Sequence, residues 1–313
     1  MKDSKGRSIS YARISVTDLC NLRCAYCMGK EGVAKLEHSQ VLSYENIAKI
    51  VRTLAELGIK KVRLTGGEPL VRKGILDLVA LIAQTKGIEE IALTTNGQLL
   101  SKYADGLRGA GVSAVNISLD TLDEKKYKQV TGGNIKPTLK GIDSAIAAGF
   151  DKLKLNAVLL KGINEGELRD FALFGKNKGL EVRFIELMPF EETQSYGTQH
   201  YISADKVIAK YKDLKELGRD DKVIRYAFAD GLELGFILPV SHKFCSLCNR
   251  IRITSDGFLL NCLLTSVEYD LKPYLDNPQE LKDYIASCVK KKPRSHNLKE
   301  GKSQSRCMHR IGG

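Results

Sequence analysis

The chain has 313 residues, 43% of them hydrophobic and 27% charged. This length fits one large domain or two, and the composition is that of an ordinary globular protein. No apolar run approaches the roughly 18 residues that a membrane-spanning helix needs, and the N-terminus lacks the apolar core of a secretory signal. We therefore expect a cytoplasmic protein whose cysteines stay reduced.

The chain carries a net charge of +12, and such an excess of Lys and Arg indicates an anionic partner. Residues 288–313 contain eight Lys and Arg against one acidic residue, Glu300, so +7 of this charge lies at the C-terminal end. The rest of the chain is only mildly basic. This distribution favours a compact phosphate-bearing ligand over an extended face for nucleic acid.

Short apolar runs alternate with amphipathic segments between residues 11 and 188. The runs predict strands at 12–16, 61–64, 91–94, 114–119, 153–159 and 182–187, and the amphipathic segments predict helices at 44–57, 75–84, 99–109, 137–148 and 165–178. The expected C-terminal stops of these helices are Gly58, Gly87, Gly111, Gly149 and Gly179. Six β-α units imply a parallel sheet with its active site at the C-terminal ends of the strands.

The predicted fold class is α/β. Six units are too few for a closed eight-stranded barrel, which leaves an incomplete, three-quarter β/α barrel or a doubly wound sheet, and the periodicity does not choose between them. The alternation stops after Met188, and we place a domain boundary near residues 213–221. The predicted domains are therefore residues 1–215, the β/α part, and residues 216–313, an α+β region.

Three cysteines follow the first predicted strand with the spacing CxxxCxxC. They are Cys20, Cys24 and Cys27. Three thiolates this close together can hold three irons of a [4Fe–4S] cluster and leave the fourth iron with an open position. A zinc site would need a fourth ligand, for which His38 is the nearest candidate, and unrelated buried thiols are the remaining alternative.

A second group of three cysteines lies near the other end of the chain. Cys245 and Cys248 form a CxxC pair, and Cys262 follows. This group predicts a second iron–sulfur cluster, again with one open iron. The alternative is a zinc site that takes His242 as its fourth ligand. The last two cysteines of the chain match neither spacing, and we expect them to be unliganded.

The first cysteine group, with Tyr26 before its last cysteine, resembles the signature of the radical S-adenosylmethionine (SAM) superfamily. After the second predicted strand, Gly66-Gly67-Glu68-Pro69 is similar to the superfamily motif that binds the SAM amino group. Alone this tetrapeptide would only predict a turn. The resemblance implies that SAM chelates the open iron, and that its reductive cleavage yields a 5′-deoxyadenosyl radical.

Two three-cysteine groups, the run Cys248-Asn249-Arg250-Ile251-Arg252 and a terminal Gly312-Gly313 together resemble the molybdenum cofactor biosynthesis protein A family. The resemblance covers residues 13–313. It implies a GTP 3′,8-cyclase in which the radical takes a hydrogen from C3′ of GTP and C3′ then bonds to C8. The implied product is (8S)-3′,8-cyclo-7,8-dihydroguanosine 5′-triphosphate. The resemblance also implies the three-quarter barrel, closed on its open side by a C-terminal region that carries the second cluster.

The resemblance also assigns site residues. The cluster ligands are Cys20, Cys24 and Cys27 for the first [4Fe–4S] cluster and Cys245, Cys248 and Cys262 for the second. The implied SAM contacts are Tyr26, Gly67, Ser118 and Met188. The implied GTP contacts are Arg13, Arg63, Thr94, Lys154, Arg250 and Arg252. The tail residues Gly312 and Gly313 are implied to reach the active site, and Gly29 departs from the family, which usually has proline there.

The cations also have an interpretation that needs no ligand. Arg13 and Arg63 could equally well pair with carboxylates inside a barrel, whereas Arg250 and Arg252, which alternate beside cysteine ligands, favour a role in phosphate binding. Lys154 lies in an apolar run where an unpaired charge would be costly, so we expect it to face the barrel lumen.

Two rival functions remain open. One is another radical SAM enzyme with an auxiliary cluster, which modifies a peptide or an RNA base. The other is a zinc-dependent nucleic-acid-binding protein, which only the basic tail favours. As partners of the cyclase we expect GTP, a flavodoxin- or ferredoxin-like electron donor and a downstream pyranopterin synthase. We expect a monomer or homodimer.

Overall fold

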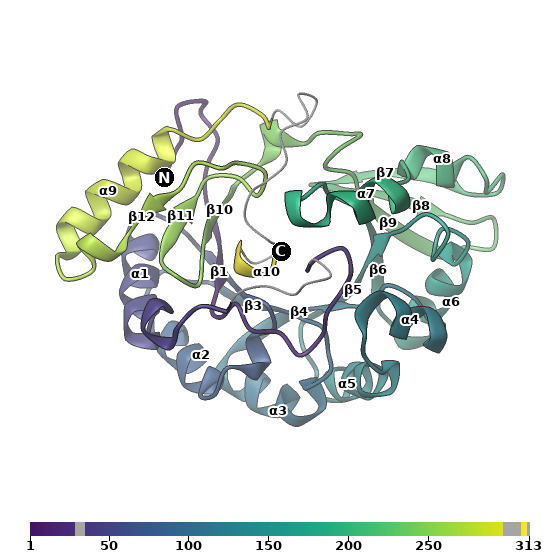
Figure 1. Cartoon of the computed structure of the whole chain (residues 1–313), viewed down its shortest axis with the longest axis horizontal. Coiled ribbons are helices and arrows are strands. Elements are labelled where there is room, and N and C mark those ends of the chain that lie inside the picture. The colour runs from purple at the N-terminus through teal and green to yellow at the C-terminus, as the bar shows by residue number, and fades with distance from the viewer. Residues whose placement is uncertain (29–34, 297–307, 312–313) are drawn as a thin grey trace.

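The computed structural model describes residues 1–28, 35–296 and 308–311 (Figure 1). Four of the residues discussed above therefore lie outside the described part of the chain. They are Gly29, Cys307, Gly312 and Gly313.

Six strands run parallel and pair in chain order. They are β1 (Tyr11–Ser15), β2 (Lys61–Thr65), β3 (Glu90–Thr95), β4 (Val112–Ser118), β5 (Lys152–Leu159) and β6 (Glu181–Glu186). The predicted helices between them are α1 (Tyr44–Glu56), α2 (Ile75–Ala83), α3 (Leu100–Ala110), α5 (Ile135–Ala147) and α6 (Leu168–Lys178). The six predicted β-α units are confirmed, with ends shifted by at most three residues.

Local sequence signals account for the ends of these helices. Ser43 caps α1, since its side chain accepts a hydrogen bond from the backbone N–H of Asn46 at 3.2 Å. The five glycines predicted as helix stops all have φ between 66° and 113°, a backbone conformation that favours glycine. Among the helices between β1 and β6, one was not predicted: α4 (Glu124–Thr131), a short and mostly polar segment capped by Asp123.

Strands from the C-terminal part of the chain extend the same sheet at both edges. Beside β6 lie β9 (Glu233–Ile237), β8 (Val223–Ala227) and β7 (Lys215–Asp220), and beside β1 lie β10 (Arg250–Ile253), β11 (Phe258–Leu260) and β12 (Tyr269–Asp270). Both β9 and β10 run parallel to the barrel strand that they pair with. The result is one open sheet of twelve strands within the described residues.

The strands curve into an arc around a central space, with the helices that link β1 to β6 on the outside (Figure 1). A doubly wound sheet would reverse its strand order and carry helices on both faces, whereas here the order from β1 to β6 never reverses. The incomplete β/α barrel is therefore confirmed, and the doubly wound alternative is excluded. Rings of Phe171, Phe184 and Phe236 pack between α6 and the sheet at centroid distances of 5.3 and 5.9 Å.

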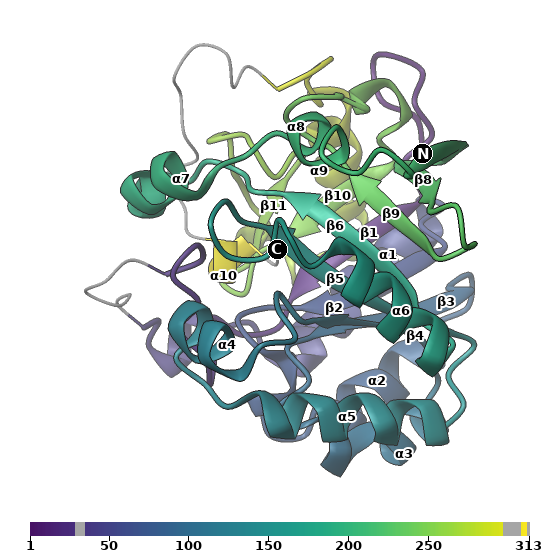
Figure 2. The same ribbon diagram turned by 90° about the vertical axis from the view of Figure 1, so that its right-hand side faces the viewer.

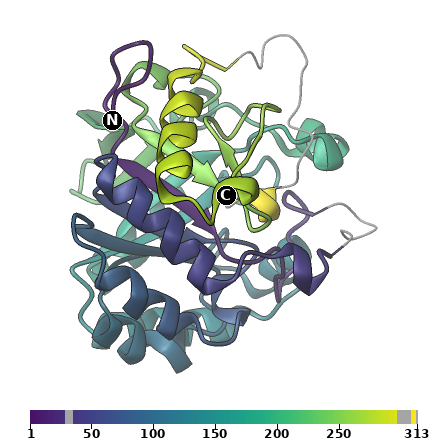
Figure 3. The ribbon, with the colours of Figure 1, turned by 90° about the vertical axis from the view of Figure 1, so that its left-hand side faces the viewer.

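The remaining helices lie around the rim and the C-terminal edge of the barrel. They are α7 (Gln194–His200), α8 (Ala204–Ile208), α9 (Pro278–Lys290) and α10 (Met308–Ile311). On the outside, α9 packs against α1 (Figure 3). By contrast, α10 lies inside the arc, where it contacts β1 (Figures 1 and 2). In the described part of the chain, no helix combines the length and the apolar character needed to cross a membrane.

Close packing of α5 against the turn after β3 yields a test of this fold. Gly141 in α5 is buried, and a Cβ there would overlap the carbonyl oxygen of Gly97. We expect Gly141→Ala to lower the free energy of unfolding by about 1–3 kcal/mol, because the turn has to move. Gly109→Ala is the matched control in α3, where a Cβ meets open space, and it should stabilise the protein slightly. Equal effects in urea denaturation would contradict this packing.

Candidate active site

The first cysteine group lies on the loop that follows β1, at the C-terminal ends of the barrel strands. Cys20, Cys24 and Cys27 are all half-buried. Burial raises the pKa of the Cys24 thiol, and the negative charges of Asp120, Cys27 and Cys20 raise it further. The backbone N–H of Leu22 donates to the Cys20 sulfur at 3.4 Å. One short loop thus gathers three thiols close enough to affect one another's ionisation.

The turn after β2 holds this loop in place. The N–H of Gly67 donates to the carbonyl of Thr17, and the N–H of Glu68 donates to the carbonyl of Leu19, each at 2.8 Å. A Cβ on Gly67 would overlap the Leu19 carbonyl. Glycine is therefore required here for packing against the chain directly before Cys20, whatever else the turn contacts.

Glu68 ties the turns after β2 and β3 together. Its fully buried carboxylate accepts hydrogen bonds from the Thr95 hydroxyl at 2.8 Å and from the Asn96 N–H at 2.7 Å. Burial raises the pKa of Glu68 to about 7, although these hydrogen bonds oppose the rise. The Asn96 side-chain amide also donates to the Cys20 sulfur at 3.8 Å. Sequence reasoning did not single out this network, because each of its members looks like an ordinary turn residue.

Three predicted SAM contacts meet at the same rim. Tyr26, Ser118 and Met188 all line one cavity. The Tyr26 hydroxyl donates to Asp120 Oδ2 at 2.8 Å, and the N–H of Val158 donates to Asp120 Oδ1 at 2.9 Å. Burial raises the pKa of Asp120 to about 6. Asp120, which the sequence did not identify as a site residue, thus fixes the orientation of Tyr26.

This cavity has a volume of about 530 Å³ and runs along the inside of the barrel. One end reaches the rim next to the first cysteine group. The other end is lined by Cys245, Cys248 and Cys262. Cys248 lies just before β10, which runs parallel to β1, so the second cysteine group lies at the opposite end of the strands from the first. The sequence did not predict this opposition.

Antiparallel pairing assembles the second cysteine group. Cys245 begins a short 3-10 helix (Cys245–Leu247), and Cys262 follows β11, whose pairing with β10 carries the chain back toward Cys248. Burial opposes ionisation of the Cys248 thiol, but the charges of Lys292 and Arg250, with a backbone hydrogen bond, hold its pKa below the ordinary value. Burial raises the pKa of Cys262.

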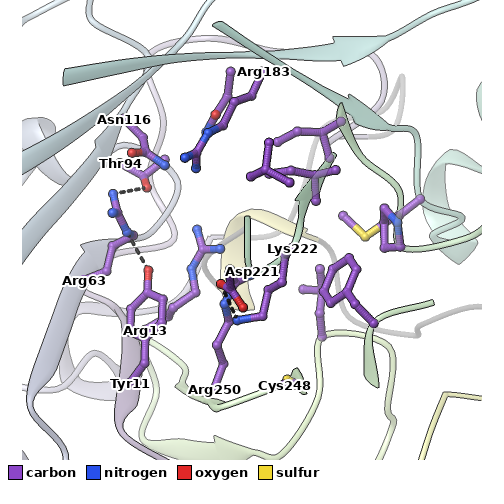
Figure 4. A pocket seen from close by; sticks show the side chains of 18 of the residues that line it. Tyr11, Arg13, Arg63, Thr94, Asn116, Arg183, Asp221, Lys222, Cys248 and Arg250 are labelled. Atoms are coloured by element: carbon purple, nitrogen blue, oxygen red, sulfur yellow. Dashed lines mark hydrogen bonds and ion pairs between the residues drawn. The ribbon is translucent and has the colours of Figure 1, made fainter. Parts of the chain in front are cut away.

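Three arginines form one layer across the inside of the barrel. Arg13 on β1 lies opposite Arg63 on β2 and Arg252 on β10, and all three line the cavity. Figure 4 shows Arg13 and Arg63 in this cavity. Arg63 donates to the Leu93 carbonyl at 2.7 Å and to the Thr94 hydroxyl at 3.3 Å. Burial, and then the charge of Arg252, lowers the pKa of Arg13. Burial lowers that of Arg252 to about 10.

Tyr11 belongs to the neighbouring layer, opposite Lys61 and Arg250. Its hydroxyl accepts a hydrogen bond from Arg63 Nε at 2.6 Å, and the Arg250 guanidinium lies 5.4 Å from its ring centroid. Burial favours the neutral phenol, but the surrounding charges, led by Arg63, lower the pKa of Tyr11 to about 7. Tyr11 is thus a candidate counter-charge that sequence reasoning missed.

Four further cations line the cavity that sequence reasoning did not assign. They are Lys61, Lys152, Arg183 and Lys222. Lys154, which the sequence did identify, also lines it, and Glu181 accepts contacts from Lys154 at 2.8 Å and Arg183 at 2.7 Å. The signal that could have revealed them is a polar residue at every second position of a strand, as in Lys152-Leu153-Lys154, because such alternation indicates that one face of the strand lines a polar cavity. Parallel strands covered on both faces normally read as continuous apolar runs.

The end of the described chain docks inside the barrel, against β11 and the segment that follows β6. Ile311 is fully buried and packs with Phe190 and Leu260, and Met308 lines the cavity. Arg252 Nη1 donates to the Ile311 carbonyl at 3.4 Å. The tail therefore reaches the cavity up to the residue before Gly312.

Comparison with known proteins places the chain in a family. The profile of the Radical SAM superfamily matches residues 14–175, and that of Molybdenum Cofactor Synthesis C matches residues 180–298. GTP 3′,8-cyclase of Alkaliphilus oremlandii is 43% identical, and that of Pelotomaculum thermopropionicum is 44% identical, with 100% of each chain covered in both cases. The chain belongs to the GTP 3′,8-cyclase family.

Solved structures of another protein share the fold of this chain. Streptococcus suis SuiB bound to the precursor peptide SuiA matches with a TM-score of 0.65 over 95% of this chain and 74% of that one. SuiB bound to S-adenosylmethionine matches with a TM-score of 0.62 over 96% and 76%. The identity is 18% in both cases, so this likeness concerns the fold alone.

The cofactors of this chain are SAM and two [4Fe–4S] clusters. The two cysteine groups fit such clusters, since each offers three half-buried thiols and sulfur atoms that accept hydrogen bonds from backbone N–H groups. Three thiols per group leave one iron of each cluster free for another ligand.

Titration of Tyr11 offers a test of the cation layers. Its folded pKa of about 7 lies below the ordinary value of 10.0, so the unfolded chain binds more protons between about pH 7 and pH 10. Stability from this group therefore increases as pH rises through that window and is lost as pH falls through 7. We expect Tyr11→Phe to remove this increase in urea denaturation, and the tyrosinate ultraviolet band to lose its most acidic component.

Tyr44→Phe is the control for this titration, because burial raises the pKa of Tyr44 to about 12. It should leave the pH profile unchanged. An unaltered profile in Tyr11→Phe would show that the cations do not ionise Tyr11.

Proposed function

We propose that this chain is a GTP 3′,8-cyclase of molybdenum cofactor biosynthesis, which converts GTP to (8S)-3′,8-cyclo-7,8-dihydroguanosine 5′-triphosphate. The observation that carries the proposal is a cavity that runs from the second cysteine group to Tyr26, beside the first group, and is lined by cations in between. The relatives that bear the cyclase name match this chain along its full length.

The cavity suits a nucleoside triphosphate in size and charge. Its volume of about 530 Å³ lies within the range of small-molecule sites, and its described lining includes nine Lys and Arg against five Asp and Glu. One guanidinium group can donate two parallel hydrogen bonds to two phosphate oxygens. Four arginines project into this space from the adjacent strands β2, β1 and β10: Arg13, Arg63, Arg250 and Arg252. Thr94 and Lys154 complete the proposed GTP contacts.

At the rim, Cys20, Cys24 and Cys27 would hold the first cluster. When bound, a cluster with one open iron supplies the electron that cleaves SAM to a 5′-deoxyadenosyl radical. The residues proposed to hold SAM are Tyr26, Gly67, Ser118 and Met188. Asp120 fixes the Tyr26 ring through the hydroxyl, and the turn at Gly67 fixes the cysteine loop.

At the other end, Cys245, Cys248 and Cys262 would hold the second cluster and present its open iron to the base of GTP. Substrate held at both ends, by cations and by this site, would keep C3′ and C8 at a fixed separation, so ring closure becomes effectively unimolecular. Inside the barrel, α10 packs against Phe190 and Leu260, where it would limit access of water to the reacting atoms. Gly312 and Gly313, which follow α10, are proposed to extend into the cavity.

The chief alternative is a radical SAM enzyme with an auxiliary cluster that modifies a peptide or an RNA base. The cavity favours the cyclase, because most of its cations lie inside the barrel rather than along an open groove that a polymer could follow.

Several wider features follow from the same proposal. We propose that the protein works in the cytoplasm and receives electrons from a flavodoxin- or ferredoxin-like donor. We also propose that it passes its product to a pyranopterin synthase. We also propose that residues 1–215 and 216–313 act as the two domains, and that the chain works as a monomer or homodimer.

Anaerobic reconstitution with iron and sulfide, followed by SAM, reductant and GTP, tests the division of labour between the clusters. We expect Cys24→Ala to abolish formation of 5′-deoxyadenosine. Cys248→Ala should retain part of it and lose the cyclic nucleotide, both measured by mass spectrometry. Cys288→Ala is the matched control, since Cys288 is buried outside both groups and should keep full activity. Near-normal cyclisation by Cys248→Ala would leave the second group a merely structural role.

Binding assays test the phosphate contacts. A hydrogen bond to a charged group contributes roughly 1.5–3 kcal/mol, so Arg250→Ala should weaken GTP binding about ten- to a hundredfold. The control is Arg219→Ala, at an exposed position on β7. Guanosine, which lacks the phosphates, should bind both variants alike. Equal losses for GTP and guanosine would show that Arg250 supports only the cysteine loop.

A further inference from the structure

Lys292 belongs to the basic C-terminal run, yet only 3% of it is exposed. It follows α9 and points away from solvent, unlike Lys290 and Lys291 beside it. Its ammonium Nζ donates to the carbonyl of Arg250 at 2.8 Å and to the carbonyl of Asn261. A buried ammonium is costly unless it has hydrogen-bond acceptors and a negative partner.

The two carbonyls belong to the two segments that carry cysteines of the second group. Arg250 lies two residues after Cys248, and Asn261 lies directly before Cys262. The Lys292 ammonium therefore links the start of β10 to the end of β11. Its charge also opposes the effect of burial on the pKa of Cys248. Burial lowers the pKa of Lys292, and Cys248 and Cys262, when ionised, oppose this shift.

The third cysteine is tied to the same segment by Arg7. Arg7 Nη1 donates to the Cys245 carbonyl at 2.7 Å, and Nη2 donates to the carbonyl of Pro293, the residue after Lys292, at 2.6 Å. Asp3 holds the Arg7 guanidinium in place at 2.6 Å. The chain around Lys292 is thus anchored to all three loops of the second cysteine group.

The surroundings of the first cysteine group are different. There burial raises the pKa of Cys24 and of Cys20, and the carboxylates of Asp120 and Glu68 raise them further. The buried ammonium of Lys292, by contrast, lies beside the second group. The contacts of Lys292 allow it both to set the spacing of the cysteines in the second group and to offset the negative charge of a cluster bound there.

We propose that Lys292 is a positioning residue for the second cluster, which holds the Cys248 and Cys262 segments at cluster-binding separation and places a fixed positive charge beside the cluster. The inference rests on the ligand assignment of the proposed function. A fixed cation stabilises the more negative, reduced cluster, so it raises the reduction potential. The hydrogen bonds to two backbone carbonyls slow the loss of iron.

The test uses the full-length chain with Cys24→Ala, so that the second cluster is the one studied. Two variants separate charge from hydrogen bonding. Lys292→Met removes both, and Lys292→Gln removes the charge but keeps a donor. Lys290→Met is the matched control, since it removes the same charge from an exposed position on α9. Circular dichroism and thermal melting establish that each variant is folded.

The readouts are the midpoint potential from EPR-monitored titration and the rate of iron loss to a chelator. We expect both Lys292 variants to have a lower potential than the Lys290→Met control. Lys292→Met should lose iron roughly ten- to a hundredfold faster, with a smaller increase for Lys292→Gln. An unchanged potential in both variants, or unchanged iron loss in Lys292→Met, overturns the proposal. A parent protein without any cluster instead overturns the ligand assignment itself.

Discussion

Repulsion between cations that face one another across the barrel constrains the whole structure. Arg13, Arg63 and Arg252 lie side by side in one layer, where the medium is less polarisable than water and like charges repel strongly. Inside the protein, the Tyr11 hydroxyl accepts a hydrogen bond from Arg63, and Glu181 offsets the charges of Lys154 and Arg183. An anion with several charges would stabilise this arrangement further. Binding of a triphosphate in this cavity would therefore also reduce the repulsion between its cations.

The two cysteine groups have opposite electrostatic surroundings despite offering the same number of thiols. Carboxylates of Glu68 and Asp120 lie near the first group, whereas Arg250 and Lys292 lie near the second. Opposite surroundings suit different tasks. A negative setting favours a cluster that gives up an electron readily, and a positive setting favours one that stays in a fixed state and binds a ligand close to a triphosphate.

Sequence periodicity was sufficient to predict the six β-α units, because the spacing of apolar residues within a strand or helix depends on which of its faces is buried. It could not show which strands pair across long stretches of chain. The register that sets Tyr11 beside Arg250 appears only in three dimensions, and so does the position of the second cysteine group opposite the first. Lys61 and Arg183 were missed for a related reason. A single cation in a strand does not indicate that other strands also direct cations into the same cavity.

The position of β1 has a consequence for how the chain folds during synthesis. One edge of β1 pairs with β2, which follows soon after, but the other edge pairs with β10, which begins at residue 250. Until that segment leaves the ribosome, β1 presents an unpaired edge, and unpaired edges invite contact with other chains. The cations on Tyr11-Ala12-Arg13 and Lys61-Val62-Arg63 keep that nascent surface charged. The same residues that line the finished cavity thus also protect the unfinished sheet from aggregation.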